Sequence, residues 1–175
     1  GIIYKRLGMF KEAHAHYDKA LQVNPTGRLL LNSKVQAHTW QHEYEEAYRW
    51  VQRYNEHHYG DDHSLLGTGY VLMQLKRWTE AIPWLEAWLA KSPKDDRCVN
   101  NLARCHGKLG DTARALSGFA KALELNPNNS YVYHNRASVL AELGRFDEAC
   151  ADLKRSIELE YTWVIDSILL AMRAS

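Results

Sequence analysis

An alanine recurs at a constant interval along the chain. Five alanines are each separated by 34 residues: Ala13, Ala47, Ala81, Ala115 and Ala149. An aromatic or apolar residue follows each of them four positions later, and three of them end the related phrases LGMFKEA (7–13), LGDTARA (109–115) and LGRFDEA (143–149). A fixed period of this length is typical of a repeat array, in which a short structural unit is stacked on copies of itself.

Each period contains signals for two helices. In the fourth period, apolar or small residues recur at helical spacing over 96–109, and Gly110 is placed to end that helix. Asp111 is placed to cap a second helix that runs to about Leu125. The Asn126-Pro127 pair then breaks the chain direction. The period therefore predicts a helix–turn–helix unit.

The signals at other helix ends are less regular. We expect Ser130 to cap the first helix of the fifth period. In the second and third periods, His42 and Arg77 are expected to replace the turn glycine. Large residues also replace small ones at close-contact positions, with Val35 in the first helix of the second period and Tyr54 and Trp88 in second helices. These periods are expected to keep the register but to depart from ideal helix packing.

This pattern resembles the tetratricopeptide repeat, a unit of 34 residues with two helices. The fourth period agrees with the family frame at Val99, Leu102, Ala103, His106, Ala115, Phe119, Ala122 and Pro127. The resemblance implies an all-α, right-handed α-solenoid, or superhelix, of five repeats plus one extra helix, with residues 1–175 forming a single array. The repeats would span 28–61, 62–95, 96–129 and 130–163, with partial repeats at 1–27 and 164–175.

The recurrence of small and large residues has a packing reason. The small residues of the frame would lie where the two helices of a repeat approach closely, and the aromatic or apolar residues would fill the space beside them. One helix pair cannot bury its apolar face alone, so stacked pairs share a continuous core. The final segment, WVIDSILLAMRAS, is apolar on most faces, with Ile165, Ile168, Leu169 and Met172 among its residues. We therefore expect possible self-association through the ends of the array.

Composition limits the classes of partner. The formal net charge is +1 and no run of apolar residues is long enough for a membrane span, so we expect no nucleic-acid binding and no membrane insertion. Cys98, Cys105 and Cys150 form no compact disulfide framework, and Cys98 and Cys105 are about 10 Å apart along one predicted helix. A reducing, cytoplasmic setting is the expectation that follows.

No motif for catalysis or for a cofactor is present. The sequence lacks a glycine-rich phosphate loop, a nucleophile elbow and a paired-histidine zinc motif, so we predict no enzyme activity, no cofactor and no assigned metal ligand. The densest polar cluster is HHYGDDH (57–63). It is either a histidine and carboxylate metal site or a solvated loop in which Gly60 takes the turn and Asp61 or Asp62 caps the next helix. His38 and His106 occupy a frame position that is usually Tyr, which indicates core or boundary residues.

The family resemblance implies that the first helices of the repeats line a concave groove. Carried onto this sequence, it gives nine candidate peptide-binding residues: Tyr70, Arg97, Asn100, Asn101, Arg104, Lys108, Tyr131, His134 and Asn135. The fourth repeat contributes three cations and no acid to its groove positions, which favours a partner with an acidic element. Asparagine has both a donor and an acceptor, so it can hold the backbone of an extended peptide.

Two further features of the groove refine this expectation. Asn101 and Asn135 occupy equivalent positions and look like the asparagine ladder of O-linked N-acetylglucosamine transferases, with only two rungs. The spacing of Lys, Arg and Asn that holds acidic chaperone tails in related repeat proteins is not present in any register. We therefore expect a non-catalytic protein–protein interaction scaffold that binds an extended, acidic segment. The alternatives are a recognition or targeting domain of a larger enzyme, such as a glycosyltransferase, and a self-assembling array.

Overall fold

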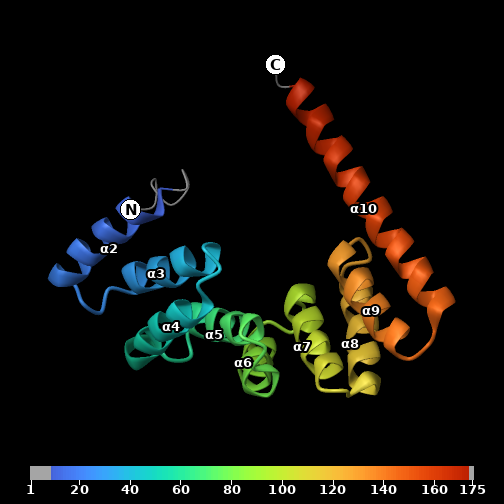
Figure 1. Cartoon of the computed structure of the whole chain (residues 1–175), viewed down its shortest axis with the longest axis horizontal. Coiled ribbons are helices and arrows are strands. Elements are labelled where there is room, and N and C mark those ends of the chain that lie inside the picture. The colour runs from blue at the N-terminus through green and yellow to red at the C-terminus, as the bar shows by residue number, and fades with distance from the viewer. Residues whose placement is uncertain (1–8, 174–175) are drawn as a thin grey trace. The chain divides into compact units, whose positions relative to one another are not determined.

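The computed structural model describes the backbone of residues 9–173 and the side chains of residues 9–160. All regular secondary structure in this part of the chain is α-helical, as expected (Figure 1). The helices are α2 (Phe10–Val23), α3 (Arg28–Trp40), α4 (Tyr44–His58), α5 (Asp62–Gln74), α6 (Trp78–Lys91), α7 (Asp96–Lys108), α8 (Thr112–Leu125), α9 (Ser130–Glu142) and α10 (Phe146–Arg173).

The chain divides into two compact units, Gly1–Trp88 and Leu89–Ser175. In the first unit, α3 packs against α4, and α2 and α5 lie beside this pair. In the second unit, α7 packs against α8 and α9 packs against α10, with α8 also contacting α9 (Figure 1). The division falls inside α6 at Trp88, one of the large residues that replace a small one. A single continuous array stays a prediction.

The periodic residues form the cores of both units. The five alanines that mark the period are 0–4% exposed, and Tyr17, Val51, Leu85 and Phe119, four positions later, are 0–3% exposed. Close helix contact explains the small residues beside them. A Cβ atom on Gly118 of α8 would lie 2.7 Å from the Cβ of Ala103 in α7, and one on Gly69 of α5 would lie 2.9 Å from Leu85 in α6. A larger side chain at either glycine would force the helices apart.

The first helix of each pair ends in the same backbone motif. Four residues have a left-handed backbone with φ of 59–82° and follow each other at the 34-residue period: His42, Lys76, Gly110 and Gly144. At each, the next residue donates its N–H to a carbonyl five residues earlier, as Arg77 does to Leu72 and Asp111 to His106, both at 2.9 Å. This is a Schellman motif, which needs the left-handed residue to reverse the chain. Lys76, and not Arg77, therefore replaces the glycine in the third period, while the expectation for His42 is confirmed.

The first helices of three successive repeats begin at side-chain caps that also follow the 34-residue period. Asp61, Asp95 and Asn129 each accept hydrogen bonds from backbone N–H groups in the first turn of α5, α7 and α9. Asp111 caps α8 in the same way. The prediction for Ser130 was wrong by one residue, because Asn129 already supplies the capping oxygen and Ser130 lies inside the helix. α3 follows Gly27 and has no side-chain cap.

The last helix is longer than expected. α10 runs from Phe146 to Arg173 without a break, so the predicted boundary between 163 and 164 does not interrupt it. The physical reason is local, since Tyr161 stands where the family frame has proline and no Gly or Pro occurs anywhere in the helix. Phe146, Leu153 and Ile157 of α10 are 65%, 41% and 62% exposed. The residues Ile165, Ile168, Leu169 and Met172 have side chains outside the described part.

None of the helices in the described part combines the length and apolar character that a membrane crossing requires.

Candidate functional site

Helices α7 and α9 lie beside each other in the second unit and are joined by two polar contacts. The amide nitrogen of Asn135 in α9 donates a hydrogen bond to the Oδ1 of Asn100 in α7 at 3.1 Å. At the C-terminal ends of the two helices, Lys108 Nζ lies 3.7 Å from Glu142 Oε1. We use the name α7–α9 surface for the candidate groove residues that the sequence places on these two helices: Arg97, Asn100, Asn101, Arg104, Lys108, Tyr131, His134 and Asn135.

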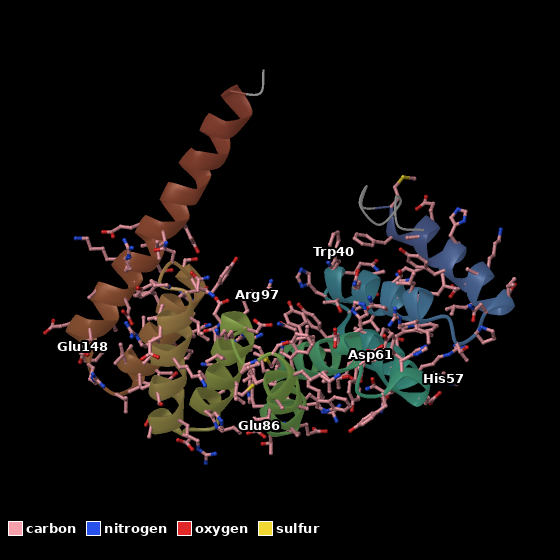
Figure 2. All side chains as sticks on the ribbon, turned by 180° about the vertical axis from the view of Figure 1, so that it is seen from behind. Trp40, His57, Asp61, Glu86, Arg97 and Glu148 are labelled. Atoms are coloured by element: carbon pink, nitrogen blue, oxygen red, sulfur yellow. The ribbon has the colours of Figure 1, made fainter. Side chains whose placement is uncertain are left out.

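The α7–α9 surface contains buried and accessible polar groups. Asn100 is 5% exposed and accepts the bond from Asn135, so it fixes the position of Asn135 and is not itself an open binding group. Asn101 and Arg104 are half-buried, whereas Lys108 in the last turn of α7 is exposed. Arg97 in the first turn of α7 is also exposed (Figure 2). Within the described part of the chain, neither the Arg97 guanidinium nor the Asn101 amide has a hydrogen-bond partner.

Aromatic groups border this polar centre. Tyr131 is 71% exposed in the first turn of α9, and His134 is exposed one turn further along. Tyr70 belongs to α5 in the first unit, where it is 43% exposed. The structure thus brings eight of the nine candidate residues into one unit and places Tyr70 in the other.

The α7–α9 surface has less unpaired positive charge than the three cations of the fourth repeat indicated in the sequence. Lys108 is close to Glu142, although both side chains are about half exposed and such a pair contributes little. The Asp96 carboxylate accepts hydrogen bonds from Asn126 at 3.1 Å and Asn129 at 2.7 Å, which ties the start of α7 to the turn before α9. Arg104 also has an interaction, so Arg97 is the cation of this surface whose side chain has no partner among the described residues.

Sequence reasoning missed a partly buried ion pair in the same unit. Arg136 of α9 replaces the leucine of the family frame, and its guanidinium donates two hydrogen bonds of 2.7 Å to Asp152 of α10, whose side chain is 9% exposed. The hydrogen bonds to Asp152 raise the pKa of Arg136 above its ordinary value. The pair lines an open cavity of about 350 Å³ together with Leu116, Leu140, Arg145, Glu148 and Ala151. The signal was the charged residue at an apolar frame position, but its partner could not be identified from spacing.

The two buried cysteines show no features of nucleophiles. Cys98, Cys105 and Cys150 are not joined in disulfides, and of the three Cys150 is exposed. Burial raises the pKa of Cys98 to about 12 and that of Cys105 to about 11, so both thiols stay protonated at neutral pH. His106, the neighbour of Cys105 in sequence, is itself buried, as expected for its frame position.

The 57–63 segment has structural roles. Gly60 has a φ of 78°, and Asp61 caps α5 and accepts a hydrogen bond of 2.7 Å from Tyr54. His58 Nε2 contacts the Thr26 carbonyl oxygen at 2.7 Å. The capped loop is thus confirmed, and among the described residues these side chains do not converge as a metal-binding set.

Comparisons with known proteins agree with the repeat pattern. Models described as tetratricopeptide repeat match residues 1–26, 42–96, 97–129 and 119–151. Superkiller complex protein 3 of Mus musculus is 31% identical over 99 residues, which are 57% of this chain and 6% of that protein. Protein FlbA of Caulobacter vibrioides is 35% identical over 86 residues, 49% of this chain and 14% of that protein. The chain thus spans a small part of the length of these relatives.

Solved structures show the same fold. MamA from Desulfovibrio magneticus RS-1 superimposes with a TM-score of 0.81 at 19% identity, covering 91% of this chain and 90% of that one. YrrB, described as a TPR protein with an unusual peptide-binding site, has a TM-score of 0.73 at 20% identity and covers 90% of this chain and 81% of its own. Identity at this level shows the fold alone, but the family models cover most of the sequence. The chain belongs to the tetratricopeptide repeat family.

Proposed function

We propose that this protein is a non-catalytic protein–protein interaction scaffold that binds an extended, acidic segment of a partner on the α7–α9 surface. The observation that carries the proposal is the combination of an exposed Arg97 with Asn101 in the adjacent turn of α7, two side chains with no hydrogen-bond partner among the described residues. An arginine can hold a carboxylate in a bidentate manner, and an asparagine amide can bond both the N–H and the C=O of a peptide backbone.

The neighbouring groups support the same type of ligand. Asn135 is held in position by its bond to Asn100, so little side-chain freedom would be lost when it contacts a peptide. Tyr131 offers a flat apolar face next to these polar groups. Among relatives, the Hsp70-Hsp90 organizing protein 2 of Arabidopsis thaliana and the mitochondrial import receptor subunit TOM70 of Saccharomyces cerevisiae have names that imply protein partners. The buried cysteines and the structural 57–63 segment favour a role without catalysis.

The test compares two variants that each remove one cation and one asparagine. Arg97→Ala/Asn101→Ala alters the α7–α9 surface, whereas Lys121→Ala/Asn128→Ala alters exposed positions of α8 and the following turn. Each protein is used to select ligands from a displayed peptide library, and selected peptides are measured by fluorescence anisotropy. We expect enrichment of acidic peptides that bind the parent and the control equally and the first variant at least about tenfold more weakly.

The outcome that contradicts this proposal is equally clear. Peptides that bind all three proteins with the same affinity would place the interaction outside the α7–α9 surface. An acidic chaperone-tail peptide is included as a separate probe, and we expect it to bind no better than a scrambled sequence. A recognition domain of a larger enzyme would use the same surface, so weaker peptide binding by Arg97→Ala/Asn101→Ala is compatible with that role as well.

Self-association is a second candidate, favoured by one observation on α10. Phe146, Leu153 and Ile157 are exposed along the helix at spacings of seven and four, which places them on one face. Such a face would pack against a further helix pair or a second copy. Sedimentation velocity over a range of concentrations tests this role. Leu153→Glu/Ile157→Glu should shift an associating parent to monomer, and a parent that is monomeric throughout would remove this candidate.

A further inference from the structure

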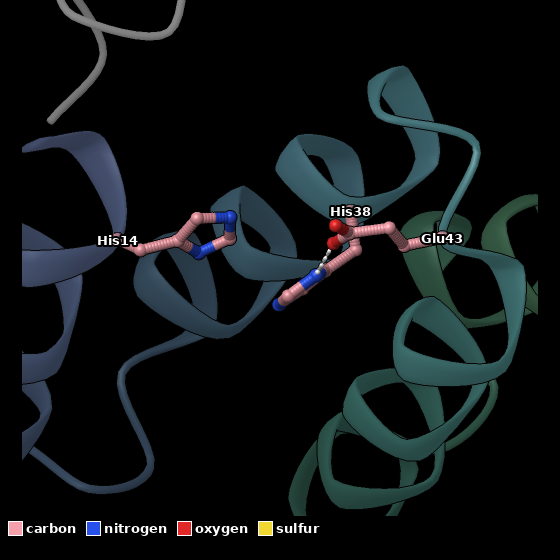
Figure 3. Close-up of side chains that lie close together, drawn as sticks. All are labelled: His14, His38 and Glu43. Carbon is pink, nitrogen blue, oxygen red and sulfur yellow. Dashed lines mark hydrogen bonds and ion pairs between the residues drawn. The ribbon is translucent and has the colours of Figure 1, made fainter. Parts of the chain in front are cut away.

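Three side chains of types that ligate metals converge in the first unit, which does not contain the α7–α9 surface. His14 extends from α2, His38 from the last turn of α3, and Glu43 from the position just before α4 (Figure 3). The two imidazole rings have centroids 4.3 Å apart, and His38 Nδ1 lies 2.7 Å from Glu43 Oε2. One potential ligand atom from each of the three lies within 4.8 Å of the others, a combination found at this single place in the described part of the chain.

The donor set suits a specific class of ion. Two imidazole nitrogens and one carboxylate oxygen are ligands for zinc and related first-row divalent metals, with bonds of about 2.0–2.2 Å. Ligand atoms around a tetrahedral ion of this size are roughly 3.4 Å apart. The ligand atoms would therefore have to approach each other by roughly 1.4 Å or less when an ion binds. A solvent molecule would complete the coordination, because the protein supplies three ligands.

The anchoring of these residues favours a preformed site. His38 and Glu43 flank the Schellman motif that joins α3 to α4, and their backbones are linked by a hydrogen bond of 2.9 Å from Glu43 N to His38 O. His14 and His38 are half-buried, which limits competition from bulk water, while Glu43 is exposed and leaves a route of entry. The cost of ordering the ligands is thus largely met by the fold.

The Lys34 ammonium group lies next to the three candidate ligands and affects how an ion would bind. Lys34 is 4% exposed, and its Nζ lies 3.3 Å from His14 Nδ1 and 2.6 Å from Asp18 Oδ1. Its ammonium group would repel a bound dication, although Asp18 offsets part of that charge. Gln41 Nε2 lies 2.9 Å from the other ring nitrogen of His14. His14 therefore faces two donor groups, and an ion that takes one ring nitrogen would displace one of them.

We propose that His14, His38 and Glu43 form a binding site for a divalent transition metal such as Zn²⁺. An ion bound there links α2 to the α3–α4 pair. Because each repeat contacts mainly its neighbours, this link would stabilise the docking of α2 without altering the α7–α9 surface. The site is independent of the proposed peptide interaction.

The experiment is a calorimetric titration of Zn²⁺ into the full chain after treatment with a chelator. The chain has nine histidines, so the control must show which of them bind the ion. We compare the parent with His38→Gln and Glu43→Gln, and with His57→Gln/His63→Gln, which removes two exposed histidines of the 57–63 segment. Circular dichroism without metal checks the fold of each variant, and Glu43→Gln, at an exposed position, keeps the test valid if His38→Gln is poorly folded.

We expect one Zn²⁺ per chain, binding at least about tenfold more weakly to His38→Gln and Glu43→Gln, with the 57/63 control unchanged. Co²⁺ bound to the parent should give the visible absorption of a four-coordinate ion. Lys34→Met should bind Zn²⁺ more tightly than the parent, because the repelling charge is removed. The proposal is overturned if Zn²⁺ binds the parent and Glu43→Gln equally, if the 57/63 control abolishes binding, or if no Zn²⁺ binds.

Discussion

At the scale of single residues, the left-handed position at the end of each first helix shows how one φ value constrains the sequence. Gly110 and Gly144 adopt φ of 82° and 72° without steric cost, whereas His42 and Lys76 adopt φ of 60° and 59° with a Cβ atom present. A left-handed residue with a Cβ costs roughly 1–2 kcal/mol. The two non-glycine positions both lie in the first unit, so strain is retained there at the turns after α3 and α5.

Replacement of Lys76 by glycine should relieve this strain. We expect Lys76→Gly to raise the free energy of unfolding by about 1 kcal/mol, because Lys76 is exposed and its side chain is not needed for packing. Chemical denaturation followed by circular dichroism measures the change. The matched control is Gly110→Ala, which should destabilise by a similar amount. A destabilised Lys76→Gly would mean that the lysine side chain contributes more than its backbone costs.

The Asp61 carboxylate predicts a dependence on pH. Desolvation opposes its ionisation, but hydrogen bonds from Tyr54 and from the backbone of Ser64 outweigh that effect and lower its pKa below the ordinary value of 3.8. A carboxyl group with a lowered folded-state pKa stabilises the fold above 3.8 and loses that contribution as the pH falls through its folded-state pKa. Asp61→Asn can still cap α5 but no longer titrates.

We therefore expect the free energy of unfolding of Asp61→Asn to fall less steeply than that of the parent as the pH is lowered from neutral through 3.8. Urea denaturation at a series of pH values measures both slopes. Tyr54→Phe should give an intermediate result, because it removes one of the bonds that stabilise the carboxylate. Parallel curves for the parent and Asp61→Asn would show that the carboxyl group is not perturbed in the folded state.

At the scale of helices, the second unit contains an ion pair where the repeat frame has an apolar contact. Arg136 and Asp152 join α9 to α10 through two hydrogen bonds, and Asp152 is 6% exposed. Burial makes the desolvation cost of the Asp152 charge high, so this carboxylate left alone is worse than neither partner. We therefore expect the pair to contribute little net stability compared with an apolar contact.

A double-mutant cycle at this pair tests the argument. We expect Arg136→Leu to lower the free energy of unfolding by about 3 kcal/mol, because it leaves the buried Asp152 carboxylate unpaired, and Asp152→Leu to lower it less, because Arg136 is more exposed. The double variant should lie within about 1 kcal/mol of the parent, since leucine suits the apolar frame position. Urea denaturation of the four proteins gives the coupling energy. Additive losses would show that the two side chains act separately.

At the scale of the whole molecule, the two compact units have cores of their own. Phe119 is 0% exposed and packs with Val99, Ala103, Val132 and Val139 from α7 and α9. Val35, Ala47, Val51 and Val71 form a separate cluster in the first unit. In repeat proteins each repeat is stabilised by its own packing and by contacts with its immediate neighbours. A substitution in one core should therefore destabilise the nearby helices more than the distant ones.

Truncation of Phe119 should show this local response. We expect Phe119→Ala to cost about 3–5 kcal/mol and to reduce the hydrogen-exchange protection of α7, α8 and α9 more than that of α3 and α4. Mass spectrometry of peptides after exchange measures each helix. Leu153→Ala, at an exposed position of α10, is the control and should change little. Equal loss of protection in all helices would indicate one cooperative unit.

The repeat period by itself determined the family, the all-α class and most residues of the core, because buried alanines and aromatics recur at an interval that is visible in one dimension. The exception is Leu153, which the period places in the core and which is 41% exposed on α10. It also predicted the turn at Gly60 and the cap at Asp111, since both depend on local backbone chemistry. The errors at Arg77 and Ser130 were shifts of one residue, which the sequence pattern does not resolve and the backbone hydrogen bonds do.

Only the tertiary structure decided which distant side chains meet. The bond from Asn135 to Asn100, the pairing of Arg136 with Asp152 and the convergence of His14 on His38 each join residues of different helices. Sequence spacing gives the face of a helix on which a residue lies, but not the residue opposite it on the next helix. That depends on how closely two helices approach and at what register, which is set by the packing of all their side chains together.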